Sequence, residues 1–181
     1  MMIFASRIAA AVLLSLAALV QAQTLPQEVA ATLPQSQFAG ASTMKFLGLG
    51  IYDAKLWTAP GFKAERYADF PLVLELSYLR SLSGSAIAKR SLDEMRRAGS
   101  LDAAKEKRWL VAMQEAFPDV KSGDRITGVH TPGVGARFWF NGQLKATIPD
   151  PEFSRLFFGI WLSSSTSEPR LRTELLARVS P

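Results

Sequence analysis

The sequence holds few side chains whose type and spacing could support catalysis. It has a single histidine, His130, and no cysteine, which excludes the common zinc and haem-thiolate sites. Its two G-x-G segments, at 48–50 and 133–135, do not extend into a dinucleotide-binding or P-loop motif. A G-x-S-x-G nucleophile elbow is also missing. We therefore expect no metal and no cofactor.

The remaining titratable residues are better explained by structure than by catalysis. A Ser-His-Asp triad would need His130, which we expect at a strand end, where a histidine held by hydrogen bonds is the simpler interpretation. Asp119 and Asp124 flank a turn, where carboxylates usually bond backbone amides. Asp150 precedes a proline and a glutamate, a pattern typical of a helix start. We name no catalytic residue.

The first 22 residues are typical of a cleavable signal peptide. Arg7 precedes an apolar run from Ile8 to Val20, which is too short for the roughly 20 residues that span a bilayer. Val20-Gln21-Ala22 offers small or neutral residues to a signal peptidase, so we predict cleavage after Ala22 and export to a periplasm. An uncleaved anchor helix is the alternative.

The rest of the chain is long enough for one domain with a sizeable core. The net charge of +5 is mild and its charges alternate in sign, so we expect no nucleic-acid partner. We also expect no membrane span in the mature protein. Since disulfides are impossible, burial of the apolar residues, 48% of the chain, must stabilise the fold.

Strands and helices are expected in groups. Residues 23–39 indicate a loose lead-in with a short strand at Glu28–Leu33, followed by a domain over residues 40–178. We expect strands at 45–57 (bent, or two strands meeting at a bulge), 72–79, 124–131, 135–140 and 143–148. We expect helices that start at Ser83 or Ser85, Ser100, Asp150 and Ser167. This order favours an α+β fold with an antiparallel sheet and helices on one face.

Two local patterns are especially clear. Asn141-Gly142 predicts a hairpin, because both residues tolerate the positive φ of a type I′ turn. The helix after Asp150 carries an apolar stripe at helical spacing, which we expect to face the core. The stripe consists of Phe153, Leu156, Phe157, Ile160 and Trp161.

Five segments of the chain form an ordered set: Gly50-Ile51-Tyr52-Asp53-Ala54-Lys55-Leu56, residues 109–120, Gly123-Asp124-Arg125-Ile126-Thr127-Gly128, Phe138-Trp139-Phe140-Asn141-Gly142 and residues 150–162. Taken together, they resemble the bacterial chalcone-isomerase-like family. Their order and spacing are similar over roughly residues 40–176. The resemblance implies an open-faced antiparallel sheet, with helices packed on one face and a cleft between sheet and helices.

The resemblance also implies a catalytic set, which this chain lacks. The related plant chalcone isomerases close a flavanone ring with an early-strand arginine, a strand threonine, a tyrosine and an asparagine, which steady a developing enolate. Here no arginine lies between Arg7 and Arg66, Leu47 takes the threonine's place, no tyrosine lies within 85–97, and Asn141 belongs to a turn. Losing one such donor costs about 100-fold or more, so we expect no isomerase activity.

A non-catalytic, secreted binding or accessory protein is therefore the first hypothesis. Its cleft would hold a lipid-like or aromatic small molecule, with Leu47, Tyr52, Phe157 and Trp161 as the expected ligand-binding residues. A related plant branch binds fatty acids through an arginine and a tyrosine that are missing here. A carboxylate would then need another anchor, such as Lys45 or Arg90.

Two further hypotheses remain open. The chain could be an isomerase or intramolecular lyase for another substrate, using Lys45, Tyr52 or Arg90. It could instead be a scaffold for an envelope protein partner, with a filled core and no cavity. The volume and the lining of the space between sheet and helices distinguish these hypotheses.

Overall fold

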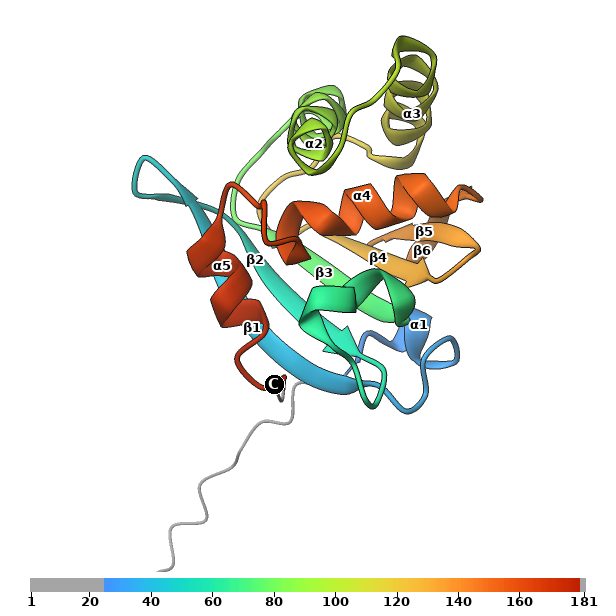
Figure 1. Cartoon of the computed structure of the whole chain (residues 1–181). Helices are drawn as coiled ribbons and strands as arrows, with labels where there is room; N and C mark the ends of the chain where they lie inside the picture. Colours follow the sequence, from blue (N-terminus) through green and yellow to red (C-terminus); the bar gives the residue numbers. More distant parts are fainter. Residues whose placement is uncertain (1–24, 180–181) are drawn as a thin grey trace, which may run out of the picture.

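Six strands form one antiparallel sheet in which every strand pairs with its neighbours along the chain (Figure 1). The structure, a computed structural model, describes residues 25–179, so the predicted signal peptide and its cleavage site lie outside the described residues. The strands are β1 (Gln37–Phe46), β2 (Leu49–Thr58), β3 (Leu72–Tyr78), β4 (Arg125–Thr131), β5 (Gly135–Phe140) and β6 (Gln143–Ile148). The expected α+β class and antiparallel sheet are confirmed.

The longer helices gather on one face of this sheet (Figure 1). In chain order the helices are α1 (Gln27–Ala30), the 3-10 helix η1 (Ala64–Asp69), α2 (Gly84–Ala98), α3 (Ala103–Ala116), α4 (Pro151–Leu162) and α5 (Pro169–Leu175). Helix α4 packs on β4 and β5, α2 packs on α4, and α5 packs on β1.

The apolar stripe of α4 forms the centre of the core, as predicted. Phe153, Leu156, Phe157 and Trp161 are buried, and Ile160 is partly buried against them. The Phe153 and Phe157 rings stack with centroids 5.6 Å apart, and Phe138 of β5 meets Phe157 edge to face. Aromatic packing of this kind adds to the burial itself and fills the space between α4 and the β4–β5 part of the sheet.

Two of the four predicted helix starts are confirmed. Ser83 Oγ accepts from the Ala86 N–H, and Asp150 Oδ1 accepts from the Phe153 N–H at 3.0 Å. The other two were predicted at the wrong residue. Helix α3 is capped by Asp102, whose carboxylate accepts from the Lys105 N–H, since an acid suits the positive end of the helix dipole better than a serine does. Helix α5 has Glu168 at its N-cap, with no side-chain cap.

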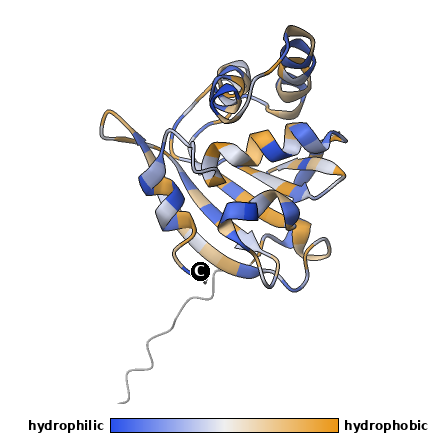
Figure 2. Ribbon diagram, in the orientation of Figure 1, coloured by the Kyte–Doolittle hydropathy of each residue, from blue (hydrophilic) through white to orange (hydrophobic). Residues whose placement is uncertain are grey.

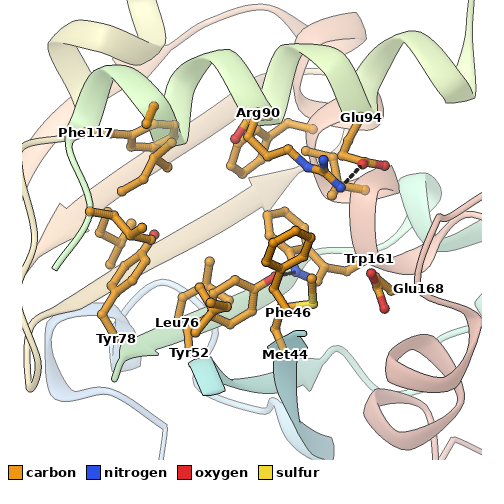
Figure 3. A pocket seen from close by; sticks show the side chains of 18 of the residues that line it. Met44, Phe46, Tyr52, Leu76, Tyr78, Arg90, Glu94, Phe117, Trp161 and Glu168 are labelled. Carbon is orange, nitrogen blue, oxygen red and sulfur yellow. Dashed lines mark hydrogen bonds and ion pairs between the residues drawn. The ribbon is translucent and has the colours of Figure 1, made fainter. Parts of the chain in front are cut away.

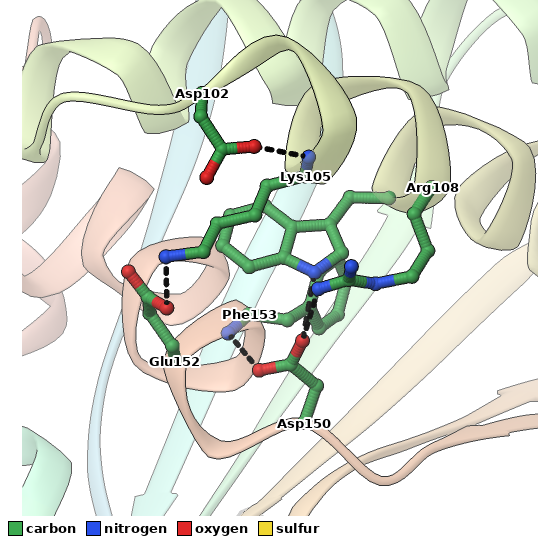
Figure 4. Close-up of polar contacts among 7 residues, drawn as sticks. Asp102, Lys105, Arg108, Asp150, Glu152 and Phe153 are labelled. Atoms are coloured by element: carbon green, nitrogen blue, oxygen red, sulfur yellow. Dashed lines mark hydrogen bonds and ion pairs between the residues drawn. The ribbon is translucent and has the colours of Figure 1, made fainter.

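Polar contacts around Asp150 fasten α3 to α4 (Figure 4). The second carboxylate oxygen of Asp150 accepts from Trp109 Nε1 at 2.8 Å and from Arg108 Nη2 at 3.4 Å. Lys105 Nζ lies 2.7 Å from the Glu152 carboxylate. The structure therefore confirms the structural role predicted for Asp150.

The short strand expected at Glu28–Leu33 is wrong, because this segment holds the end of helix α1 and the turns that follow it. Val29 and Leu33 are four residues apart and pack on the second face of the sheet, against Trp57, Val73, Val129 and Trp139. Burial of this one-sided apolar pair favours a helical turn over a strand. The segment is thus packed on the sheet, and β1 already begins at Gln37.

Of the two forms expected for 45–57, a bent strand or two strands meeting at a bulge, the structure is closer to the second: the segment holds the end of β1, a turn and β2. Phe46 pairs with Leu49, so Leu47 and Gly48 form a two-residue turn with φ of 50° and 79°. Ile51 is an extra residue in β2, where the pairing shifts register. The hairpin predicted at Asn141-Gly142 is confirmed, with φ of 48° and 86°.

Candidate functional site

A pocket of about 350 Å³ lies between the sheet and the helices (Figure 3). Strands β1 to β4 form its floor, helix α2 its roof, and the C-terminal half of α4 its wall. Its apolar lining includes Met44, Ile51 and Leu76 from the sheet, Ile87 from α2, and Phe157 and Trp161 from α4. The filled core assumed by the scaffold hypothesis is therefore not what the structure contains.

The structure brings together three of the four predicted ligand-binding residues. Tyr52, Phe157 and Trp161 all line the pocket. Leu47 is not among the lining residues, because it occupies the β1–β2 turn with 86% of its surface exposed. Of the two proposed anchors for a carboxylate, Arg90 lines the pocket, and Lys45 is an exposed residue near the same turn that does not.

Five polar residues of the lining were not predicted from the sequence: Tyr78, Ser91, Glu94, Ser167 and Glu168. Tyr78 comes from the end of β3, Glu94 from α2 and Glu168 from the loop before α5. Tyr78 was identified only as the end of a strand. Tyr78 pairs with Tyr52 across β3 and β2, so both rings lie at one end of the floor. A prediction of this strand pairing could have identified Tyr78 as a lining residue.

Two tyrosine hydroxyls supply the polar chemistry of the pocket floor. Trp161 Nε1 donates to the Tyr52 hydroxyl at 3.0 Å, which leaves the hydroxyl proton of Tyr52 available to a ligand. The Tyr78 ring meets the Tyr52 ring edge to face, with centroids 6.0 Å apart. Tyr78 is only 3% exposed, and within residues 25–179 its hydroxyl makes no hydrogen bond to the protein. Since no fully buried side-chain oxygen in this range lacks a partner, the hydroxyl is partly open to the pocket and can donate to a ligand.

Both hydroxyls stay protonated near neutral pH. Burial raises the pKa of Tyr52 to about 12, against a smaller opposing effect of the hydrogen bond from Trp161. Burial also raises the pKa of Tyr78, and the neighbouring Tyr52 adds to the shift. The two tyrosines are therefore suited to donate hydrogen bonds to an acceptor oxygen and unsuited to act as bases.

The charged residues of the pocket lie on its helical side, where Arg90 and Glu94 extend from α2 (Figure 3). Arg90 Nη2 lies 2.6 Å from Glu94 Oε1, and Arg97 Nε lies 3.6 Å from the other oxygen of this carboxylate. Glu168 contributes a further negative charge. Because Arg90 is already paired, the pocket does not offer an uncompensated cation to an anionic ligand. No cluster of metal-binding side chains occurs in the described part of the chain.

The single histidine lies in the core. His130 Nε2 is 2.9 Å from the Ala68 carbonyl oxygen, and Nδ1 is 2.6 Å from Ser154 Oγ. Burial lowers the pKa of His130, which favours the neutral ring. The structure confirms the prediction that hydrogen bonds hold His130 in place. Ser154 is completely buried, so a substrate has no path to the His130–Ser154 pair.

Comparisons with known proteins agree with this architecture. The chain is 27% identical over 128 residues to an uncharacterized protein of Haemophilus influenzae; the match covers 71% of this chain and 61% of that relative, so the chain spans about three fifths of the relative's length. Among solved structures, it is similar to the fatty-acid binding protein AtFAP1 of Arabidopsis thaliana, with a TM-score of 0.61 and 10% identity, over 78% of this chain and 87% of that one. At this identity the likeness concerns the fold alone.

Between residues 25 and 179, none of the helices combines the length and the apolar character that crossing a bilayer requires.

The profile of the chalcone isomerase-like family matches residues 17–177. This match covers most of the sequence and agrees with the six-stranded sheet and its helical cover, so the chain belongs to the chalcone isomerase-like family.

Proposed function

We propose that this chain is an exported periplasmic protein that binds a lipid-like or aromatic small molecule in its pocket without transforming it. The observation that carries the proposal is a mostly apolar pocket of about 350 Å³ in which two protonated tyrosine hydroxyls are the donors of the floor. Small-molecule sites typically enclose roughly 300–1,000 Å³ and combine apolar walls with a few placed polar groups. This pocket has that character.

Binding without chemistry is supported by what surrounds the two hydroxyls. With their raised pKa, Tyr52 and Tyr78 cannot withdraw a proton from a ligand at neutral pH. Glu94, a buried carboxylate of the pocket lining, is engaged by Arg90 and Arg97. The threonine that the plant isomerases place before the Gly-Ile-Tyr segment would fall at Leu47, which lies in the turn outside the pocket.

Fatty acids and their neutral derivatives are the ligand class that fits best. An apolar chain would lie against Leu76, Phe157 and Trp161, and its head would place an acceptor oxygen near the two tyrosines. The structural similarity to a plant fatty-acid binding protein supports this class. Because Arg90 is paired with Glu94, we expect a fatty acid and its methyl ester to bind with similar affinity.

The test is displacement of a fluorescent fatty-acid analogue from the purified protein. Tyr78→Phe should weaken binding up to about tenfold, the value of one hydrogen bond, and leave stability unchanged because its hydroxyl makes no hydrogen bond to the protein within residues 25–179. Tyr67→Phe is the matched control, since the Tyr67 hydroxyl donates to the Arg155 carbonyl oxygen and is not in the pocket lining. Equal affinity of both variants and the wild type would contradict the assigned role of Tyr78.

A second pair of variants tests the pocket itself. Ile87→Trp places a large ring in the space between α2 and the floor, so it should abolish binding of the analogue. Val111→Trp is the control, because Val111 is a half-exposed residue of the neighbouring helix α3 and does not line the pocket. Binding that survives Ile87→Trp, or native mass spectra of periplasmic protein that never show a ligand, would overturn the proposal.

The mature N-terminus, read by mass spectrometry after expression of the full chain, tests export and cleavage after Ala22.

A further inference from the structure

An apolar surface at the end of the β1–β2 hairpin is the feature that ligand binding in the pocket does not explain. Four large apolar residues are exposed there: Phe46 (60%), Leu47 (86%), Leu49 (54%) and Leu79 (42%). We call these four residues the apolar tip. The hairpin projects beyond the body of the molecule, and the hydropathy colouring shows apolar segments at its end (Figures 1 and 2).

The four side chains surround the end of the hairpin on both of its faces. Phe46 and Leu49 pair with each other and share the face that carries Met44 and Tyr52, and Leu47 lies in the turn. Leu79 lies on the opposite face, because a Cβ placed on Gly50, which pairs with Lys45, would come within 2.8 Å of Leu79 Cδ1. Soluble proteins rarely gather exposed apolar side chains in one place unless the surface meets a partner.

The backbone at Leu47 gives a second reason to expect a function. Leu47 has a φ of 50°, in the left-handed region that glycine and asparagine adopt at low cost and leucine does not. Its side chain also gains no burial from the fold, with 86% of its surface exposed. Leu47 is thus unfavourable both in conformation and in hydration, and unfavourable residues that persist in a fold commonly serve a binding site.

The apolar tip continues into the pocket. Phe46 is exposed at the tip and also lines the pocket, and Met44 and Ile51, the next apolar residues along the two strands, line it as well. An apolar molecule that leaves the pocket beside Phe46 would therefore move along apolar side chains as far as Leu47. Phe46 thus connects the pocket with the surface that the tip contacts. A partner that binds the tip should therefore itself hold apolar molecules.

The charge around the tip favours a lipid surface over a protein partner. Lys45 is exposed within the hairpin, and Arg80 lies at its base, where its Nε donates to the Gly50 carbonyl oxygen at 3.0 Å. No acidic residue occurs between Met44 and Tyr52. Exposed leucine and phenylalanine side chains next to cationic ones form a surface that matches the acyl chains and phosphates of an anionic bilayer.

We propose that the apolar tip inserts into the interface of a phospholipid bilayer, with Lys45 and Arg80 at the lipid phosphates. A few inserted side chains give reversible attachment, in contrast to a transmembrane anchor. In this orientation Phe46, which also lines the pocket, contacts the bilayer. The further step, that a lipid-like ligand passes between bilayer and pocket beside Phe46, rests on the proposed function.

Vesicle flotation with the purified exported protein tests the insertion. Wild-type protein should float with vesicles of phosphatidylethanolamine and phosphatidylglycerol, less with neutral vesicles, and less at high salt. Leu47→Asp and Leu49→Asp should each lower the partition coefficient about tenfold or more, since each replaces an inserted apolar group by a charge. The matched controls are Val134→Asp and Leu144→Asp, whose side chains are similarly exposed (59% and 55%) outside the tip.

Two further measurements exclude indirect effects. In Leu47→Trp the new indole should shift its emission to the blue when vesicles are added, beyond any change that the wild-type protein shows through its native tryptophans, Trp57, Trp109, Trp139 and Trp161. Leu47→Asn suits the turn better than leucine, so it should fold at least as stably as the wild type and still lose vesicle binding. Such a result would separate membrane attachment from folding.

The outcomes are distinct from those of the ligand experiment. Leu47→Asp should bind the fluorescent analogue normally in vesicle-free buffer, and Tyr78→Phe should bind vesicles normally. Vesicle binding unchanged in both aspartate variants, or lowered equally in the Val134 and Leu144 controls, would overturn the proposal. Self-association of the wild type that Leu47→Asp abolishes, in the absence of vesicle binding, would also overturn it and assign the tip to a second copy of the chain.

Discussion

The two tight hairpins of the sheet have almost the same backbone and opposite surroundings. Leu47-Gly48 joins β1 to β2 with φ of 50° and 79°, and Asn141-Gly142 joins β5 to β6 with φ of 48° and 86°. The second residue is glycine in both turns. The hairpins differ in the first residue, which is an apolar side chain in one and an amide in the other.

The amide of Asn141 fastens its turn to the rest of the protein. Its Oδ1 accepts from the Arg125 N–H at 2.8 Å, and its Nδ2 donates to Asp124 Oδ1 at 3.0 Å. Leu47 has no polar side-chain group, and its turn projects from the molecule (Figure 1). The same backbone therefore serves to secure one edge of the sheet, at β5 and β6, and to expose apolar surface at the other edge, at β1 and β2.

The largest change in the free energy of unfolding is expected when Asn141 of the β5–β6 turn is replaced by leucine, the residue at the same position of the β1–β2 turn. Asn141→Leu removes two side-chain hydrogen bonds and places a leucine at positive φ, so the free energy of unfolding should fall by about 2–3 kcal/mol. Urea denaturation monitored by circular dichroism measures this change. A loss below about 0.5 kcal/mol would show that the amide contacts contribute little and would remove the contrast between the hairpins.

The glycines test whether the two backbones are equivalent. Gly48→Ala and Gly142→Ala each place a Cβ at a φ near 80°, and neither Cβ would meet an atom closer than 4.0 Å. Each substitution should therefore lower the free energy of unfolding by a similar amount, about 1–2 kcal/mol, through backbone strain alone. Clearly unequal losses would mean that one turn can relax to another conformation.

A smaller gain in stability is expected from the reverse exchange at the exposed turn. Leu47→Asn puts a residue that tolerates positive φ where leucine is strained, so the free energy of unfolding should rise by about 0.5–1 kcal/mol. The melting temperature and urea midpoint of the variant and wild type measure it, with Leu144→Asn, on a strand, as the control. A decrease on Leu47→Asn would argue that the exposed leucine stabilises the hairpin and would weaken the case for a binding role.

The smallest expected effect is a difference in acid sensitivity. The hydrogen bond from Asn141 and then that from the Lys121 N–H lower the pKa of Asp124 below its usual value. The stabilisation linked to this depressed pKa is present above the pKa of the unfolded chain, about 4, and is lost as the pH falls through the folded-state pKa. Asn141→Leu should therefore lose less stability than the wild type between about pH 5 and pH 2, and parallel curves would disprove the coupling.

Local patterns predicted those elements whose signal lies within a few residues. The Asn141-Gly142 turn, the Asp150 cap and the apolar stripe of α4 all have short-range physical causes, and the structure confirms them. The Leu47-Gly48 turn was missed because leucine carries no turn preference. It becomes a turn because Phe46 and Leu49 pair in the β1–β2 ladder, which is a contact between strands.

The candidate site was predicted only in part for the same reason. Tyr52, Phe157 and Trp161 were placed in the cleft by resemblance and by the stripe of α4, and they line the pocket. Tyr78 and Glu94 were missed because their position at the pocket depends on strand pairing and on how α2 packs over the sheet. The expectation for Leu47 as a lining residue does not match its exposed position in the turn.

The sequence by itself determined the class of fold, the absence of thiol chemistry and the strongest turns and caps, because these follow from composition and from neighbours along the chain. Tertiary structure alone decided that a pocket remains open between α2 and the sheet, that Tyr78 joins Tyr52 in its lining, and that Leu47 is exposed in the turn next to Phe46, which lines the pocket. Each of these depends on side chains from separate strands and helices, whose distances are set only when the whole sheet and its helices pack together.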